Sequence, residues 1–72
     1  MLYGGAMKVV TIKINGQTAS NRTRNRIKEN GPDFELKDSS NRNNQTLLKS
    51  INGGWFGWLP DNEFVIVKTL ER

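Results

Sequence analysis

The stretch NGGWFGWLPDNEFVIV, residues 52–67, decides the fold. It opens with residues 52–54, whose asparagine and two glycines are typical of a tight reversal between two strands. An aromatic strand follows over residues 55–59, and Pro60 ends it because proline has no backbone N–H to give to a sheet. The apolar run over residues 63–70 predicts a closing strand. This order of turn, strand, break and strand is typical of the end of a small β-barrel.

Three strands are expected ahead of this stretch. Residues 8–14 (KVVTIKI) are β-branched and alternate between two faces, as in a half-buried strand. A second strand begins over residues 34–37, and a third over residues 46–51 returns antiparallel along residues 55–59. Residues 38–45 (DSSNRNNQ) are all polar and include three asparagines and two serines, which predicts a polar loop. Several short strands joined by tight turns indicate a small antiparallel barrel or compact sheet.

The alternation of apolar residues also predicts the core. Phe34 and Leu36 point inward from their strand, and we expect them to contact Val65 or Val67. The side chains expected to be buried are Ile12, Leu36, Leu48, Ile51, Leu59 and Val65.

The dipeptide Asn15-Gly16 directly follows the first strand. Asn-Gly suits the positive φ angles of a type I′ turn, which joins two strands of a hairpin. We therefore expect a short return strand from Gln17, although the side chains that follow offer little to bury.

A short surface helix is expected between the first two long strands. Ser20 suits a helix N-cap, and Gly31 suits a left-handed residue that ends a helix. Ile27 is the only apolar residue between these two positions. The helix near residues 20–30 is therefore expected to attach to the core through this one side chain.

Five consecutive segments near the C-terminus match a known order of elements. They are Lys49-Ser50-Ile51, Asn52-Gly53, Gly57-Trp58-Leu59-Pro60, Asp61-Asn62-Glu63 and Phe64-Val65-Ile66-Val67. This part of the chain resembles the Src-homology-3-like barrel, which ends with a strand, a two-residue turn, a strand closing on Gly-aromatic-apolar-Pro, a short helical turn and a final apolar strand. The resemblance implies a mainly β fold, a small barrel of about five antiparallel strands, with the short surface helix near residues 20–30 added to it.

The front of the chain departs from that family. Peptide-binding members line a groove with early tyrosines and an acidic first loop. This chain has a single tyrosine, Tyr3, and the matching loop holds Arg22, Arg24 and Arg26. The resemblance therefore implies the barrel but does not imply binding of proline-rich peptides. The groove-type residues that it carries over are Trp55, Trp58 and Pro60.

Length and composition limit the organisation of the chain. Its 72 residues are enough for one domain. We expect residues 1–6 to be a flexible lead-in and residues 7–72 to form the barrel domain. The absence of cysteine favours a reducing compartment, so a cytoplasmic location is expected. No apolar run approaches the roughly 18 residues that span a bilayer, so no membrane partner is expected. The small size and the asparagine-rich loops suit a phage or mobile-element protein.

Charge is unevenly distributed along the chain. The residues up to Lys28 include six basic and no acidic ones, whereas those from Glu29 onward include five basic and seven acidic ones. A front segment of one sign is typical of a surface for an anionic partner. A solvated face that keeps a small protein soluble is the alternative.

The side chains used by most enzymes are missing. Without histidine and cysteine the chain has no usual general base, thiol nucleophile or transition-metal ligand. Asp33, Glu35 and Asp38 are interpreted as solubilising carboxylates on a polar strand face. We therefore expect a protein that is not an enzyme, with no metal site and no cofactor.

The aromatic residues divide between the two faces of their strand. Trp55 and Leu59 share one face, and Phe56 and Trp58 share the other. A thin barrel cannot bury both faces of every strand, so one aromatic group is expected to be partly exposed. Such a group either packs at the rim of the core or offers a stacking surface to a partner.

Two functions fit these patterns. Basic side chains beside an exposed tryptophan suit nucleic-acid binding with little sequence preference, because cations hold phosphates and the ring stacks on a base. The residues expected to contact nucleic acid are Arg22, Arg24, Arg26, Lys28, Lys13 and Arg42, with Lys8 as an outlying contributor. The alternative is a protein-interaction module, an adaptor or an inhibitor, that uses Trp55, Trp58 and Pro60 as its surface. The choice between DNA and RNA and the oligomeric state stay open.

Overall fold

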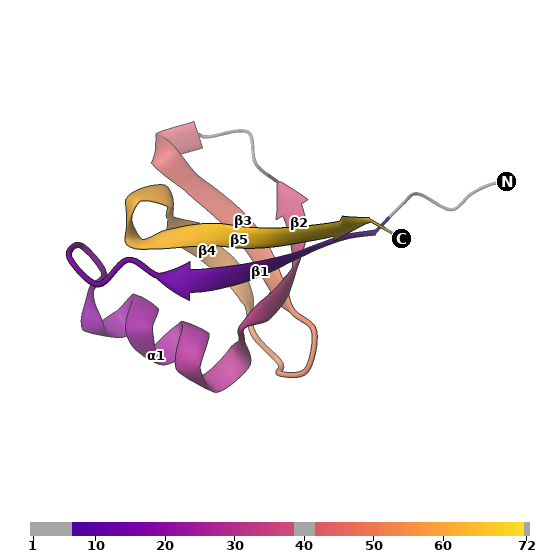
Figure 1. The fold of residues 1–72 in the computed structure, drawn as a ribbon, viewed down its shortest axis with the longest axis horizontal. Helices are drawn as coiled ribbons and strands as arrows, with labels where there is room; N and C mark the ends of the chain where they lie inside the picture. Colours follow the sequence, from indigo (N-terminus) through magenta and orange to yellow (C-terminus); the bar gives the residue numbers. More distant parts are fainter. Residues whose placement is uncertain (1–6, 39–41, 72) are drawn as a thin grey trace, which may run out of the picture.

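A computed structural model describes residues 7–38 and 42–71 and shows the predicted mainly β fold (Figure 1). Five antiparallel strands form one sheet in the order β4-β3-β2-β1-β5, so β4 and β5 are its edges. This open, strongly connected sheet is compatible with a small barrel-like fold. The lead-in expected at residues 1–6 lies outside the described residues. The elements are β1 (Lys8–Ile14), α1 (Asn21–Asn30), β2 (Asp33–Asp38), η1 (Arg42–Asn44), β3 (Gln45–Ser50), β4 (Phe56–Pro60), η2 (Asp61–Glu63) and β5 (Phe64–Glu71).

The core lies on the face of the sheet against which α1 packs, here called the inner face. In Figure 1, α1 runs beneath the sheet beside the end of β1. Phe34 and Leu48 are completely buried at its centre, and Ile27 packs on them from α1. Burying one large apolar side chain contributes about 1.5 to 3 kcal/mol, so this small cluster accounts for much of the stability. The buried apolar residues are Val10, Ile12, Ile27, Phe34, Leu48, Leu59 and Phe64.

The predicted core is confirmed in part. Ile12, Leu48 and Leu59 are buried, and Leu36 is partly buried against the cluster. The predicted burial of Ile51 is wrong, because Ile51 is 40% exposed. It lies beyond the end of β3, and the buried side chains of that strand are at every second position, Thr46, Leu48 and Ser50. The strand assignment was right, but the strand ends one residue earlier than the apolar pattern indicates.

Val65 is the second error in the predicted core. It is 50% exposed, since it lies opposite Lys13 on the other face of the sheet, here called the outer face. The expected contact of Phe34 or Leu36 with Val65 or Val67 is also wrong, because β1 lies between β2 and β5. The alternation predicted strand β5 but not its place at the edge of the sheet.

The return strand expected from Gln17 is absent from the described residues. The Asn15 side chain accepts a hydrogen bond from the Gln17 N–H at 3.1 Å, and the N–H groups of Thr18 and Ala19 donate to the Asn15 carbonyl at 3.2 and 2.9 Å. Gly16 has no positive φ, so the turn is not of type I′. The turn uses the backbone groups that a hairpin would need and leads directly into α1.

Helix α1 is confirmed where the sequence predicts it. The Ser20 Oγ accepts a hydrogen bond from the Thr23 N–H at 3.3 Å, as an N-cap does. The helix ends differently from the prediction, because Gly31 is extended at φ −101° and not left-handed. A Cβ at Gly31 would lie 2.8 Å from the Ile27 carbonyl oxygen and 2.8 Å from the Phe34 ring. Glycine is needed here for close packing.

The hairpin of β3 and β4 is confirmed. Thr46 pairs with Leu59, and the Ser50 N–H donates to the Trp55 carbonyl at 2.8 Å at the closed end. The Ser50 Oγ accepts a hydrogen bond from the Gly53 N–H at 2.6 Å, which holds the turn without a positive φ at the glycines. The short helical turn implied after Pro60 is present as η2.

Candidate functional site

The N-terminus of α1 is attached to η2 through Glu63. The Glu63 carboxylate accepts hydrogen bonds from the Ser20 N–H and the Ser20 Oγ, both at 2.9 Å. Hydrogen bonds from the Ser20 backbone and from the Thr23 side chain lower the pKa of Glu63 below its ordinary value of 4.5, although burial opposes them. Glu63 is therefore ionised at neutral pH and positions α1 beside the C-terminal end of β4.

The four cations of α1 lie in two stripes with different surroundings. Arg22 and Arg26 share the stripe toward β4, and Arg24 and Lys28 share the adjacent one. Arg24 donates to two carbonyls of the β1–α1 loop, one of them that of Gly16 at 2.9 Å. Arg24 thus stabilises the loop, whereas Arg22 and Lys28 are exposed.

Trp55 is part of the packing between α1 and the sheet. Its ring meets the buried Phe34 edge to face, with centroids 6.1 Å apart and planes at 87°. The Arg26 guanidinium lies over the same ring, 5.5 Å from its centroid. A Cβ at Gly57 would be 2.7 Å from the ring, so Gly57 makes room for it. Trp55 and Arg26 therefore stabilise each other and are half-buried.

Phe56 and Trp58 form the exposed aromatic group of β4. They are 54% and 41% exposed, while Leu59 on the inner face is buried. Because β4 is an edge strand, these rings have a neighbouring strand on one side only. The prediction that one aromatic face of this strand is exposed is confirmed, and the exposed face is that of Phe56 and Trp58.

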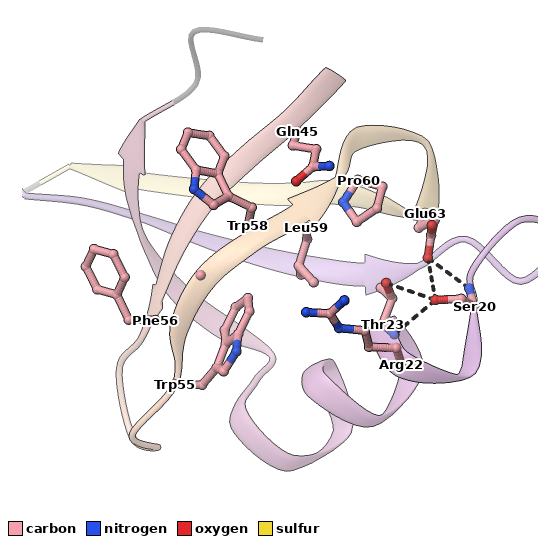
Figure 2. A pocket seen from close by; sticks show the side chains of 11 residues that line it. Ser20, Arg22, Thr23, Gln45, Trp55, Phe56, Trp58, Leu59, Pro60 and Glu63 are labelled. Carbon is pink, nitrogen blue, oxygen red and sulfur yellow. Dashed lines mark hydrogen bonds between the residues drawn. The ribbon is translucent and has the colours of Figure 1, made fainter. Parts of the chain in front are cut away.

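A groove of about 520 Å³ lies between the N-terminal half of α1 and β4, and Figure 2 shows it from close by. Arg22 extends from α1 toward Leu59 and Trp55, while Trp58 lies beyond β4. The groove has a cation on its α1 wall and aromatic rings along β4, and the anionic Glu63 stands at one end. Its lining residues are Ser20, Arg22, Thr23, Gln45, Trp55, Phe56, Gly57, Trp58, Leu59, Pro60 and Glu63.

The structure brings some of the predicted site residues together and separates others. Arg22, Trp55, Trp58 and Pro60 line the groove. Lys13 is exposed on the outer face of β1, away from α1. Lys8 is also distant, and its Nζ lies 3.6 Å from a Glu71 carboxylate oxygen. Arg42 begins η1, and its side chain lies outside the described part of the chain.

Phe56 and Glu63 line the groove but were not among the predicted site residues. The period of two along the strand did place Phe56 on the same face as Trp58, but it did not show which face is exposed. Glu63 gave no such signal. Its partner Ser20 is 43 residues away, and only the folded chain brings the two together.

The described residues were compared with two common kinds of site, a metal site and a membrane-spanning helix. Residues 7–38 and 42–71 hold no cluster of three or more metal-ligating side chains. Over the same residues, the structure shows no helix that is long and apolar enough to cross a membrane. The groove offers one cation, aromatic faces and hydrogen-bonding groups, a set that suits non-covalent binding of a ligand.

No protein-family model, no curated protein and no solved structure matches the chain.

Proposed function

We propose that this protein is a non-enzymatic module that binds nucleic acid in the groove between α1 and β4. The observation that carries the proposal is that Arg22 and the exposed Trp58 line one groove. A cation holds a phosphate and an aromatic face holds a base, so the groove has both parts of a contact with a nucleic-acid chain.

The distribution of charge on α1 supports the proposal. Arg22 and Lys28 are exposed at the two ends of the helix. Arg26 is held over Trp55, which fixes its position while it still contributes positive charge to the groove wall. Glu29 is the only acidic residue of α1. The helix therefore presents a mainly cationic surface about 15 Å long, from a rise of about 1.5 Å per residue.

The contacts proposed here carry little sequence information. Phosphate oxygens are the same at every nucleotide, and every base has a face that stacks on an aromatic ring. The protein is therefore expected to bind with weak sequence preference.

A salt titration tests the proposal. Binding of a labelled oligonucleotide is measured by fluorescence anisotropy at several salt concentrations for the parent, Arg22→Ala and Lys28→Ala. Each lost phosphate contact should flatten the log–log slope by about 0.7 to 0.9. These two cations are preferred to Arg24 and Arg26, because the latter two also stabilise the fold.

Lys8→Ala is the matched control. It removes one positive charge at the far end of β1, where Lys8 pairs with Glu71. Its slope should equal that of the parent. An absence of measurable binding by the parent at low salt, or equal slopes for all four proteins, would reject the proposal.

We also infer that the barrel-like sheet is of the Src-homology-3-like type. Two features support this: β1 pairs with both β2 and β5, and η2 follows Pro60 directly. This inference concerns the architecture and adds nothing to the proposed binding. An experimental structure in which β1 fails to pair with β5 would contradict it.

A protein-interaction module is the second candidate function. Strand β5 favours this function, because it exposes four apolar side chains that cannot bind a phosphate: Val65, Ile66, Val67 and Leu70. Exposed apolar surface of this kind marks protein contacts. Under this alternative, nucleic acid would bind weakly at any salt concentration, and the arginine variants would behave like the parent.

A further inference from the structure

The outer face of the sheet carries the exposed aromatic residues. Helix α1 packs against the inner face, where Ile27 reaches Phe34 and Leu48. Side chains alternate along a strand, so the neighbours of these buried residues point to the outer face. Phe56 and Trp58 lie there on β4, next to Leu47 and Lys49 of β3.

The pairing of strands shows what surrounds the two rings. Lys49 lies directly opposite Phe56, and Leu47 lies directly opposite Trp58. Directly opposed side chains on one face are about 5 Å apart at Cβ. The exposed Lys49 is therefore the neighbour of Phe56 on the outer face, and the half-buried Leu47 is the neighbour of Trp58.

The wider outer face is cationic. Four exposed lysines project from it: Lys13, Lys37, Lys49 and Lys68. Two carboxylates whose side chains the structure describes lie in the same region, and both have partners within the sheet. Glu35 lies 3.4 Å from the Lys37 Nζ and stands opposite Lys49 in the pairing of β2 with β3, and Asp33 accepts a hydrogen bond of 2.6 Å from the Thr11 hydroxyl. This balance of charge favours a polyanion over a neutral apolar partner.

We propose that the outer face selects single-stranded nucleic acid, with two successive bases stacked on Phe56 and Trp58 and a phosphate held by Lys49. The inference rests on the proposed function and specifies its substrate. Two residues along a strand span about 7 Å, so the rings lie side by side and offer two stacking positions. Bases inside a duplex are already stacked on each other and cannot reach these rings.

The pair of exposed rings on the outer face adjoins the groove, because both include Trp58. Trp58 belongs to the outer face and also lines the groove that contains Arg22. Strand β4 is the edge of the sheet, so a chain that passes over it meets no further strand. A single strand stacked on the outer face thus reaches the cations of α1 by crossing β4.

Parallel titrations of two ligands test the inference. A labelled twelve-nucleotide oligothymidine and a labelled twelve-base-pair duplex are titrated with the parent, Phe56→Ala, Phe56→Leu and Lys49→Ala at one low salt concentration. The parent should bind the single strand more tightly than the duplex. Phe56→Ala should weaken single-strand binding by roughly 5-fold to 140-fold and change duplex binding less than 2-fold.

The remaining variants separate stacking from folding and charge. Phe56→Leu keeps apolar bulk but has no aromatic face, so it should lose single-strand affinity while melting at the parent temperature. The single-strand titrations of the parent and Lys49→Ala are repeated at several salt concentrations, where Lys49→Ala should flatten the salt slope by about 0.7. Leu70→Ala, an exposed apolar truncation on β5, is the matched control and should bind like the parent.

The outcomes distinguish this inference from the function on which it rests. Duplex binding equal to single-strand binding, or unchanged single-strand affinity in Phe56→Leu, overturns the inference even if Arg22→Ala still flattens the salt slope. Binding of neither ligand by the parent overturns both. A single-strand preference that disappears in the two Phe56 variants and persists in Leu70→Ala supports the inference.

Discussion

The two edge strands of the sheet expose apolar side chains in different ways. Strand β4 exposes Phe56 and Trp58 on one face and closes its other face with the buried Leu59. Strand β5 buries only its first residue, Phe64, and exposes all the residues that follow. Each edge thus buries one side chain, but the inner-face positions of β4, Gly57 and Leu59, are covered, whereas Ile66, the inner-face residue of β5 opposite Ile12, is 43% exposed.

The difference shows that exposed apolar side chains lie in two different settings in this small protein. On β4 the exposed rings stand beside Lys49 and border the groove that contains Arg22. On β5 the register shifts between Thr11 and Ile12 of β1, which leaves Val67 as an extra residue. A bulge and a lysine, here Lys68, are means by which edge strands avoid pairing with other chains.

The largest expected effect concerns stability. Leu59→Ala on β4 should lower the free energy of unfolding by about 2 to 5 kcal/mol, because it leaves a cavity in the core. Val65→Ala on β5 removes an exposed side chain and should change it by about 0.5 kcal/mol or less. Urea unfolding followed by circular dichroism measures both. Similar losses in the two variants would mean that the edges are equally anchored.

The next effect concerns binding. Trp58→Ala should weaken binding of single-stranded oligonucleotide by about 1 to 3 kcal/mol without changing the salt slope, because stacking releases no counterions. Val67→Ala, the comparable truncation on β5, should leave the affinity unchanged. Anisotropy titrations at two salt concentrations provide the test. Equal losses in both variants would contradict the division of roles between the edges.

A smaller effect concerns the contact that positions α1 beside β4. The folded state holds the pKa of Glu63 below 4.5, so Glu63 stabilises the fold above that pH. This stabilisation is lost as the pH falls from about 4.5 through the folded pKa. Melting temperatures of the parent should therefore fall more steeply in this range than those of Glu63→Gln. Curves that stay parallel down to about pH 3 would show that this contact contributes nothing.

The smallest expected effect concerns self-association at β5. Lys68→Val extends the apolar run of the edge strand and should increase association at high protein concentration. Lys49→Val makes the same change on β3, which has a neighbour on each side, and should associate no more than the parent. Sedimentation velocity compares the three proteins. If Lys68→Val sediments like the parent, then the bulge alone is enough to prevent edge pairing.

Much of the fold could be predicted from neighbouring residues. Period-two alternation located the strands, Ser20 located the start of α1, and Pro60 located the end of β4. The prediction of a hairpin at Asn15-Gly16 failed because this dipeptide is compatible with more than one kind of turn. Asn15-Gly16 suits a hairpin, but the Asn15 side chain bonds the Gln17 N–H and starts a different turn.

The candidate site was predictable in composition but not in arrangement. Sequence reasoning identified cations on α1 and aromatic residues on β4. It did not distinguish Arg24, which bonds the loop, from Arg22, which lines the groove. Nor did it distinguish Trp55, which packs on Phe34, from the exposed Trp58. These distinctions depend on which side of each element meets the rest of the molecule.

The sequence by itself determined the five strands, the single helix and the two alternating faces of β4, because capping, turn chemistry and alternation act between residues close in the chain. Only the tertiary structure decided that β4 and β5 are the edges, that α1 covers one face of the sheet, and that Glu63 meets Ser20. These outcomes depend on which distant segments pack together. That choice is made by burial of the shared core and not by any local pattern.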